Sequence, residues 1–178
     1  MAKKSLPLSQ VYKLLEPGPV VMVTTSLKGQ ANVMTMSWHM MIDFEPPIVG
    51  CIISDRNYTF NTLKKTKECV INIPTAELAT QVVAVGNSSG LDVDKFEKFH
   101  LVQEPALEVG APLLTECYAN LECKVIDTKM VSKYCMFILE VVKAWIRPSK
   151  KRARMIHHYG EGVFVVDGER IKLPSKMK

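Results

Sequence analysis

The sequence is most informative at Asn32-Val33-Met34-Thr35-Met36-Ser37-Trp38. Its side chains alternate as they do along a β-strand, so that every second residue shares a face. One face carries Asn32, Met34, Met36 and Trp38, and the other carries Val33, Thr35 and Ser37. Small polar groups therefore stand where a plain core strand would have apolar ones. Two interpretations are open: a strand that binds a ligand through hydroxyl and amide groups, or an edge strand whose polar residues face solvent.

This strand is predicted to be the second half of a β-hairpin. Val20–Thr25 is rich in β-branched residues and predicts the first half, and Lys28-Gly29 supplies the turn. A third strand is expected at Ile48–Ile53, where a nearly continuous apolar run indicates burial on both faces. Further strands are expected at Cys69–Ile73, Tyr118–Asp127 and Tyr134–Ile146, and a C-terminal hairpin over Gly162–Leu173 with Asp167-Gly168 as its turn.

Helices are few and short in this prediction. The spacing of apolar residues predicts helices at Leu8–Leu15 and Arg56–Lys67, with Phe60 and Leu63 of the second facing the core. Thr75 is expected to cap another helix. Six or seven strands with so few helices argue against a doubly wound parallel sheet. We therefore expect one domain over residues 1–178, mainly β, folded as a closed or nearly closed antiparallel barrel with a few flanking helices.

Composition predicts a soluble globular protein. Of its 178 residues, 47% are hydrophobic and 23% are charged, and no segment approaches the ~20 apolar residues of a membrane span. The net charge of +5 arises largely in the last third of the chain, which we interpret as a solvated basic face. A nucleic-acid-binding module is a weaker alternative, because neither aromatic interleaving nor zinc-finger spacing accompanies these charges. Neither a nucleic acid nor a membrane is expected as a partner.

The five cysteines are odd in number and include no CxxC pair. The basic N-terminus is not followed by the apolar segment of a secretory signal, so free thiols and a cytoplasmic location are expected. Cys117 and Cys123 are six residues apart, which predicts that they share one face of a strand. No second feature of the sequence supports a disulfide between them.

Several enzyme motifs are missing from the sequence. There is no GxGxxG after a strand and no GxxxxGK[ST] phosphate-binding loop, so neither a dinucleotide-binding fold nor a P-loop protein is predicted. His157-His158 lack the HExxH spacing of a zinc site, and no metal is expected. A Ser-His-Asp arrangement can be neither identified nor excluded, because such residues meet only in space.

Cationic and hydroxyl side chains gather where the second helix is predicted to begin. Asp55 could cap this helix, whose N-terminal N–H groups and partial positive charge attract phosphate. Arg56 adds a forked, permanently charged donor, and Thr59 adds a hydroxyl one turn further on. Lys95 follows a Ser-Ser-Gly loop and could reach the same anion as a point charge. Each alone suits an ordinary surface residue, but together with the polar strand they suit flavin mononucleotide (FMN), which has a flat, polar-edged ring and a phosphate.

These segments resemble the flavin reductase-like family, and the flavoredoxins within it most closely. The similar segments are Asn32-x-x-Thr35-x-Ser37-Trp38, Gly50-Cys51-Ile52-Ile53-Ser54-x-Arg56-x-Tyr58-Thr59-x-x-x-Leu63, Val70-Ile71-Asn72-Ile73-Pro74, Val85-Gly86, Ser89-Gly90-x-Asp92-x-Asp94-Lys95-Phe96, Ala111-Pro112-Leu113-Leu114 and Leu121-Glu122-Cys123. They cover most of the chain, and their joint order and spacing are specific although each is short. The resemblance implies a split β-barrel, a homodimer and non-covalently bound FMN.

The resemblance also implies which residues bind FMN. The family pattern suggests that the ring or ribityl chain is contacted by Asn32, Thr35, Ser37 and Trp38. Around the ribityl chain and phosphate it suggests Arg56, Tyr58, Thr59 and Lys95, and we add Ser54 and Ser89 as further cofactor-binding candidates. Tyr134 is a further cofactor-binding candidate, and it stands near where flavoredoxins tend to carry a histidine on the long strand. An aromatic residue near the C-terminus, Tyr159 or Phe164, could cover the flavin.

We therefore expect an FMN-binding oxidoreductase. Because such a cofactor carries out the electron chemistry while the protein positions it, no catalytic side chain is named. One hypothesis is an NAD(P)H-dependent reductase of flavin or ferric chelates. The other is a flavoredoxin-type electron carrier that exchanges electrons with a redox protein. The lack of a separate nicotinamide motif in the sequence keeps the second hypothesis open.

Overall fold

The structure, a computed structural model, describes residues 3–11, 19–149, 152–160 and 162–174. Its main element is an eight-stranded sheet with the order β3-β2-β6-β9-β10-β5-β4, in which β1 pairs with β10 and all pairs are antiparallel. In chain order these strands are β1 (Lys4–Ser5), β2 (Val21–Leu27), β3 (Gln30–Met36), β4 (His39–Phe44), β5 (Pro47–Ile52), β6 (Glu68–Ile73), β9 (Ala119–Asp127) and β10 (Met136–Ile146).

The sheet curls on itself because its two edge strands follow each other in the chain. β3 and β4 lie at opposite ends of the strand order, yet only Ser37 and Trp38 separate them. So short a connection spans roughly 10 Å, so the two edges meet at this corner. There the backbone N–H of Ile52 on β5 donates to the Trp38 carbonyl at 3.0 Å. The result is the antiparallel barrel expected from the sequence.

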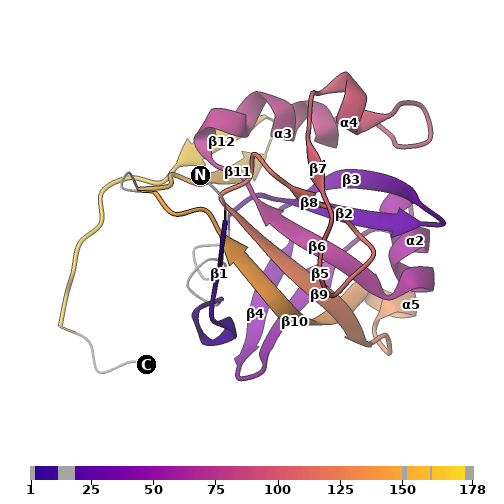
Figure 1. The fold of residues 1–178 in the computed structure, drawn as a ribbon, viewed down its shortest axis with the longest axis horizontal. Helices are drawn as coiled ribbons and strands as arrows, with labels where there is room; N and C mark the ends of the chain where they lie inside the picture. Colours follow the sequence, from indigo (N-terminus) through magenta and orange to yellow (C-terminus); the bar gives the residue numbers. More distant parts are fainter. Residues whose placement is uncertain (1–2, 12–18, 150–151, 161, 175–178) are drawn as a thin grey trace.

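Short helices and two small ladders surround the barrel (Figure 1). They are η1 (Leu8–Gln10), α2 (Tyr58–Thr66), η2 (Ala76–Leu78), α3 (Ala79–Gly86), α4 (Lys95–Lys98), α5 (Val131–Tyr134), the ladder of β7 (Gln103–Glu104) with β8 (Leu113–Leu114), and the hairpin of β11 (Ile156–Gly160) with β12 (Val163–Val166). α3, α4 and the β11–β12 hairpin lie over β2 and β3, whereas α2 and α5 close one end of the barrel. No helix in the described ranges is long and apolar enough to cross a membrane.

The β2–β3 hairpin forms as predicted. Leu27 pairs with Gln30 across a two-residue turn, in which Lys28 and Gly29 have φ angles of 54° and 80°. Positive φ at both positions matches the twist of the flanking strands, and glycine adopts it without steric cost. Because β3 pairs only with β2, its other edge carries no strand.

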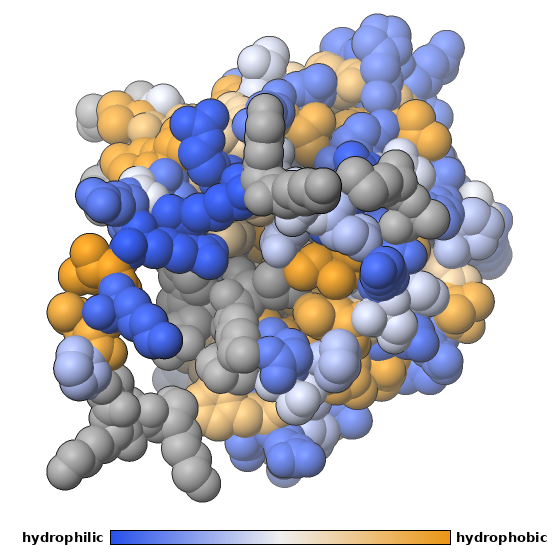
Figure 2. All heavy atoms as spheres, turned by 60° about the vertical axis from the view of Figure 1, so that its left-hand side comes forward, coloured by the Kyte–Doolittle hydropathy of each residue, from blue (hydrophilic) through white to orange (hydrophobic). Residues whose placement is uncertain are grey.

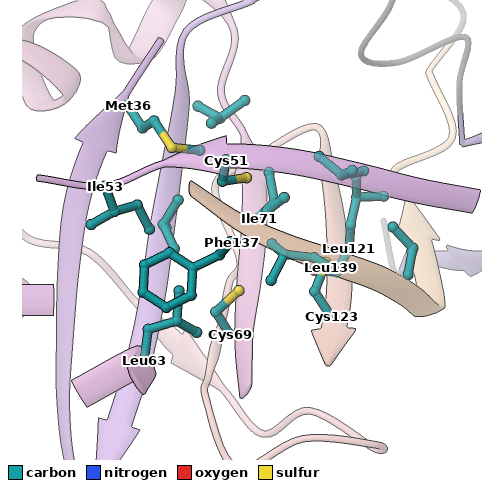
Figure 3. Close-up of a cluster of buried hydrophobic side chains, with 14 of the residues drawn as sticks. Met36, Cys51, Ile53, Leu63, Cys69, Ile71, Leu121, Cys123, Phe137 and Leu139 are labelled. Atoms are coloured by element: carbon teal, nitrogen blue, oxygen red, sulfur yellow. Dashed lines mark hydrogen bonds between the residues drawn. The ribbon is translucent and has the colours of Figure 1, made fainter. Parts of the chain in front are cut away.

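The barrel interior is filled by apolar side chains. Phe137 lies at its centre, with Ile53 and Leu63 beside it (Figure 3). The ring of Phe60 on α2 meets Phe137 edge-on, with 5.5 Å between ring centroids. Burial of each such side chain stabilises the fold by about 1.5–3 kcal/mol. The prediction that Phe60 and Leu63 of this helix face the core is confirmed.

A second apolar core lies outside the barrel, between β3 and the helices. Val33 packs there with Val82 of α3 and Phe96 of α4. The prediction that Cys117 and Cys123 share one face of a strand is wrong, because Cys117 precedes β9 and lies in this outer core while Cys123 lies inside the barrel. All five cysteines are free thiols.

Polar side chains are buried on the outer face of the central strands. The Nδ2 of Asn120 donates to the Oδ1 of Asn72 at 2.6 Å, and the same oxygen accepts the backbone N–H of Leu114 at 2.9 Å. Glu122 is fully buried and accepts the indole N–H of Trp145 at 2.7 Å. Asn120 and Glu122 lie on β9, so the alternation predicted for that strand is present. The buried polar side chains also hold β8 in place, because the N–H of Leu114 donates to Asn72.

Three details of the predicted elements are wrong. α2 begins at Tyr58 with Asn57 in the cap position, so Asp55 does not cap it. Tyr134 ends α5 instead of starting the long strand, because the backbone turns at Cys135 (φ 54°) before β10 begins. The C-terminal hairpin turns at Gly162 (φ 77°), and the predicted turn residues at 167–168 follow β12.

Two further differences concern the N-terminal half. β4 was not predicted, because its alternating exposed side chains are apolar and follow the polar strand without a clear break. Of the predicted helix at Leu8–Leu15, the structure has η1, and residues 12–15 lie outside the described ranges. Thr75 takes the cap position of η2, and α3 begins only at Ala79.

Carboxylates partly neutralise the basic C-terminal third. Arg152 lies 3.6 Å from Asp167, and Arg154 lies 3.7 Å from Glu77, nitrogen to oxygen. The backbone N–H of Ala76 also donates to the Arg154 carbonyl at 2.8 Å. Figure 2 shows hydrophilic side chains mixed with hydrophobic ones on this side of the molecule. These contacts tie the segment before β11 to the start of η2.

Candidate functional site

A cavity of about 180 Å³ lies at the free edge of β3 and is here called the β3-edge cavity. Residues of β3, the start of α2, the end of α3 and the loop to α4 line it: Asn32, Met34, Thr35, Arg56, Asn57, Tyr58, Thr59, Val85, Gly86, Ser88, Ser89, Gly90 and Lys95. Because the cavity wraps a strand edge, side chains from both faces of β3 reach it. Asn32 and Thr35 therefore share one site although they lie on opposite faces.

The start of α2 supplies hydrogen-bond donors to this cavity. Asn57 occupies the cap position, but its side chain makes no capping hydrogen bond. The first N–H groups of a helix have no acceptor within the helix and carry a partial positive charge. Arg56 precedes them, is exposed, and forms no ion pair with any residue that the structure describes. An anion at this end would meet a guanidinium and unpaired backbone donors together.

Asn32 connects β3 to α2. Its side chain is buried, and its Nδ2 donates to the Thr59 hydroxyl at 3.0 Å. Its Oδ1 faces Gly90, where an added Cβ would lie only 2.2 Å from that oxygen and 3.2 Å from the Tyr58 ring. Gly90 is therefore required for close packing of the loop against β3. These contacts set the width of the β3-edge cavity.

Lys95 is a buried cation. Its side chain is only 4% exposed, and its Nζ donates to the carbonyls of Val33 and Val85, each at 3.0 Å. No carboxylate lies within ion-pair distance of it in the described ranges. Burial lowers the pKa of Lys95 from 10.5 to about 8. Because an ammonium has three N–H donors, one is left over at the cavity wall.

A second hollow of about 320 Å³ continues from the β3-edge cavity and is here called the hairpin hollow. The two share Thr35, whose hydroxyl donates to the Val82 carbonyl at 2.6 Å, and Gly86. The rings of His158 and Phe164 stand on its hairpin side, with 4.9 Å between centroids. Its other lining residues include Ser37 and the apolar Val20, Met36, Val82 and Val83. A flat, largely apolar group suits this hollow.

The structure brings many of the candidate residues from the sequence to one place. The β3-edge cavity is lined by Asn32, Thr35, Arg56, Tyr58, Thr59, Ser89 and Lys95, and Ser37 lines the hairpin hollow. Ser54 accepts the Arg56 backbone N–H at 3.3 Å. Trp38 is 69% exposed and Tyr134 is 52% exposed, and neither lines these two hollows. The side chain of Tyr159 lies outside the described residues.

Two residues at the site escaped the sequence reasoning. The sequence shows Gly90 only as part of a motif and does not indicate its close packing against Asn32. Its position directly after the loop serines is the one sequence feature that points to that role. His158 was considered only as a zinc ligand, whereas it lines the hairpin hollow beside Phe164. Its neighbour His157 bonds Asp167 at 3.0 Å. In the part of the chain that the structure describes, no group of His, Cys, Asp or Glu side chains is arranged to hold a metal.

Comparison with known proteins accounts for this arrangement. A family model described as the flavin reductase like domain matches residues 14–164. The chain belongs to the flavin reductase-like family. An uncharacterized protein of Archaeoglobus fulgidus is similar to this chain, with 31% identity over 137 residues that cover 75% of this chain and 77% of the relative.

Solved structures show the same fold. An FMN-binding domain of a flavin reductases-like enzyme from Shewanella baltica is similar with a TM-score of 0.91 at 25% identity, covering 97% of this chain and 98% of that one. Flavoredoxin of Desulfovibrio vulgaris is similar with a TM-score of 0.79 at 20% identity, covering 89% and 91%. The expected split β-barrel of flavin reductase-like proteins is confirmed.

Lys95 should make stability depend on pH. Between its folded pKa of about 8 and its unfolded value of 10.5, the unfolded chain holds a proton that the folded chain has lost, so stability rises with pH. We expect Lys95→Met to reduce the rise in unfolding free energy between pH 8 and pH 9 by about 1 kcal/mol. Urea unfolding at both pH values measures it. An unchanged rise in the variant would show that Lys95 titrates normally.

Proposed function

We propose that this protein binds FMN without a covalent bond and acts as an FMN-dependent oxidoreductase. The observation that carries the proposal is that Arg56, the start of α2 and Lys95 all line the one β3-edge cavity. These cationic groups come from distant parts of the chain, and a phosphate is the anion that suits a helix start with a forked donor. The similar Shewanella baltica protein is described as FMN-binding.

The residues present fit the parts of FMN. Phosphate would be held by Arg56, by the first N–H groups of α2 and by the remaining N–H of Lys95. Ser89, Gly90 and Asn32 line the same cavity, and Gly90 packs tightly against Asn32. The flat ring would enter the hairpin hollow, where Phe164 offers an apolar face.

In this proposal the protein positions the cofactor and shapes access to it. When bound, FMN supplies the electron chemistry, and it accepts or donates one or two electrons. Thr35 is held by its bond to α3, so it orients the ligand where the two hollows meet. His158 and Phe164 exclude water from one side of the hairpin hollow. No side chain needs to act as an acid or base for electron transfer.

We propose an enzyme that oxidises NAD(P)H and reduces a flavin or ferric chelate. The open hairpin hollow supports this choice, because a second reactant needs a route to the ring. The alternative is an electron carrier of the flavoredoxin type that receives electrons from a redox protein. Exposed Trp38 at the corner beside the site favours that alternative, because large exposed aromatic side chains are common at protein interfaces.

We further propose that the protein is a homodimer. β4 exposes three apolar side chains, Met40, Ile42 and Phe44, each about half exposed. Gly50 on β5 continues this face, and the tip of Met136 lies over it. Contiguous apolar faces of this kind mark interfaces, and a twofold dimer buries one patch against its copy.

The free thiols also support a reducing compartment such as the cytoplasm.

The phosphate role of Arg56 can be separated from ring binding. The purified protein should be yellow, or become so with FMN, and a colourless protein that cannot be reconstituted would contradict the proposal. We expect Arg56→Ala to weaken FMN binding by about 10- to 100-fold and riboflavin binding by less than about threefold, because only FMN carries the anion. Fluorescence titration measures both ligands. Arg154→Ala serves as the matched control. Arg154 is an exposed arginine before β11 that does not line the β3-edge cavity, so its removal should change the binding of neither flavin.

Anaerobic mixing with reduced nicotinamides distinguishes the enzyme from the carrier. The FMN-loaded protein should lose its flavin absorbance within seconds of adding NADH or NADPH, because the hairpin hollow admits the donor. Stopped-flow absorbance measures the rate for each nucleotide. Bound FMN that stays oxidised with both nucleotides would reject the reductase and leave the carrier.

A charge on the β4 face should separate the dimer. We expect Ile42→Asp to give a monomer in sedimentation velocity, because an unpaired buried carboxylate costs several kcal/mol at an interface. Leu107→Asp places the same charge on another exposed apolar side chain, and it should leave the dimer intact. A wild-type protein that sediments as a monomer at micromolar concentration would end the homodimer proposal.

A further inference from the structure

A separate hollow of about 280 Å³ lies where β10 ends, beside β8, and is here called the β10 hollow. It is lined by Arg147, which follows β10, by Lys3, which precedes β1, and by Leu113 of β8. None of its lining residues belongs to the β3-edge cavity or to the hairpin hollow. A molecule bound here would therefore be a second ligand, distinct from the proposed cofactor.

A buried carboxylate fixes the apolar wall of the β10 hollow. Glu122 accepts the indole N–H of Trp145 at 2.7 Å and the backbone N–H of Leu107 at 3.1 Å. Trp145 and Leu107 both line the hollow, and Pro105 and Leu113 complete its apolar side. Because one carboxylate holds both the ring and the loop, the wall is formed before a ligand arrives, and little conformational entropy is lost on binding.

The ring of Trp145 offers the hollow an aromatic surface. Lys143 covers another part of this ring, with its Nζ 5.0 Å from the ring centre, and does not line the hollow. The part of the indole that borders the hollow is therefore open to a ligand. Aromatic rings pack on one another in offset or edge-on arrangements, so a flat apolar ring suits this wall.

Two cations with unused hydrogen-bond donors stand beside this wall. Arg147 donates through Nη2 to the Thr115 carbonyl, but its buried Nε has no hydrogen-bond partner among the described residues. The Nζ of Lys3 donates to the Leu114 carbonyl at 2.7 Å and to the Oδ1 of Asn120, which leaves its third N–H. Since Leu114 and Thr115 are consecutive, the two cations lie close together. An acceptor placed between them would satisfy both unused donors.

The charges around the β10 hollow favour an anion with one negative charge. Burial, with a smaller contribution from the charge of Arg147, lowers the pKa of Lys3 from 10.5 to about 8, so Lys3 is still charged at pH 7. Against these two cations stand Glu104, which lines the hollow, and Glu116, which lies near Lys3. These carboxylates would repel a phosphate dianion more strongly than a monoanion. A planar carboxylate also matches the fork of a guanidinium.

We propose that the β10 hollow binds a small aromatic carboxylate. Its carboxylate would accept the Nε–H of Arg147 and the remaining N–H of Lys3, and its ring would lie against Trp145. The volume of about 280 Å³ suits a single ring with one carboxylate, because it is at the small end of ligand pockets. The inference does not rest on the proposed function, since the β10 hollow and the cofactor cavity share no lining residue.

Benzoate is the probe, and the indole N–H signals of the two tryptophans report where it binds. In ¹⁵N NMR spectra of the full chain, we expect benzoate to shift the Trp145 signal with a dissociation constant of about 1 mM or below, with and without saturating FMN. The signal of Trp38 should not move, and Trp38→Phe assigns the two signals. Benzamide, the same ring without the charge, should bind at least about tenfold more weakly.

Two substitutions test the cations. We expect Arg147→Met to weaken benzoate binding by about tenfold or more and Lys3→Met by about threefold to tenfold, with benzamide binding changed by less than about twofold. The matched controls are Arg154→Met and Lys4→Met, because both residues are exposed and neither lines the β10 hollow. Circular dichroism establishes that each variant is folded, and Lys3→Met decides if Arg147→Met is not.

Each outcome decides the inference. A benzoate shift confined to Trp145, weakened in Arg147→Met or Lys3→Met and retained in both controls, supports it. The inference is overturned by an unmoved Trp145 signal at about ten times the expected dissociation constant, by equal binding of benzamide, or by displacement of benzoate by FMN. A protein that binds benzoate in this way and never binds FMN would overturn the proposed function and leave the β10 hollow as the binding site.

Discussion

The unpaired edge of β3 is the constraint on which the site depends. A strand at a sheet edge leaves backbone groups without partners, and such an edge is usually covered or used. Here the Nζ of Lys95 bonds the Val33 carbonyl, while α2 and α3 stand on either side of the strand. The protein covers this edge only in part, and the space left over is the β3-edge cavity. The chain passes from β3 to β4 at the barrel corner without pairing the two strands. The edge of β3 that stays unpaired is where the site lies.

Much of the fold could be predicted from local patterns. The β2–β3 hairpin follows from β-branched residues around Lys28-Gly29, and the antiparallel barrel follows from many strands with few helices. The missed details depend on tertiary context. β4 is apolar on its exposed face, which no alternation rule distinguishes from a buried strand. The C-terminal turn falls at Gly162 because the register of β11 with β12 decides it, and that register is invisible in the sequence.

The candidate site was predicted as a set of residues and not as a geometry. Arg56, Thr59 and Asn32 could be named because their types suit an anion and a polar ring, and the family resemblance joined them. Burial of Lys95 could not be foreseen, since a lysine in a polar segment is normally solvated and its bonds to Val33 and Val85 link residues far apart in the sequence. The exposure of Trp38 could not be foreseen either, because it results from the corner between β3 and β4, which turns this side chain outward.

The burial of Lys95 has a consequence for the life of the protein. The buried Lys95 ammonium, which has only carbonyl partners in the described residues, destabilises the fold, and an anion brought beside it would offset that cost. A ligand that binds only the folded state raises the ratio of folded to unfolded protein as its concentration rises above its dissociation constant. Flavin would then act as a folding partner as well as a reagent, and the steady amount of intact protein would follow the supply of its own cofactor.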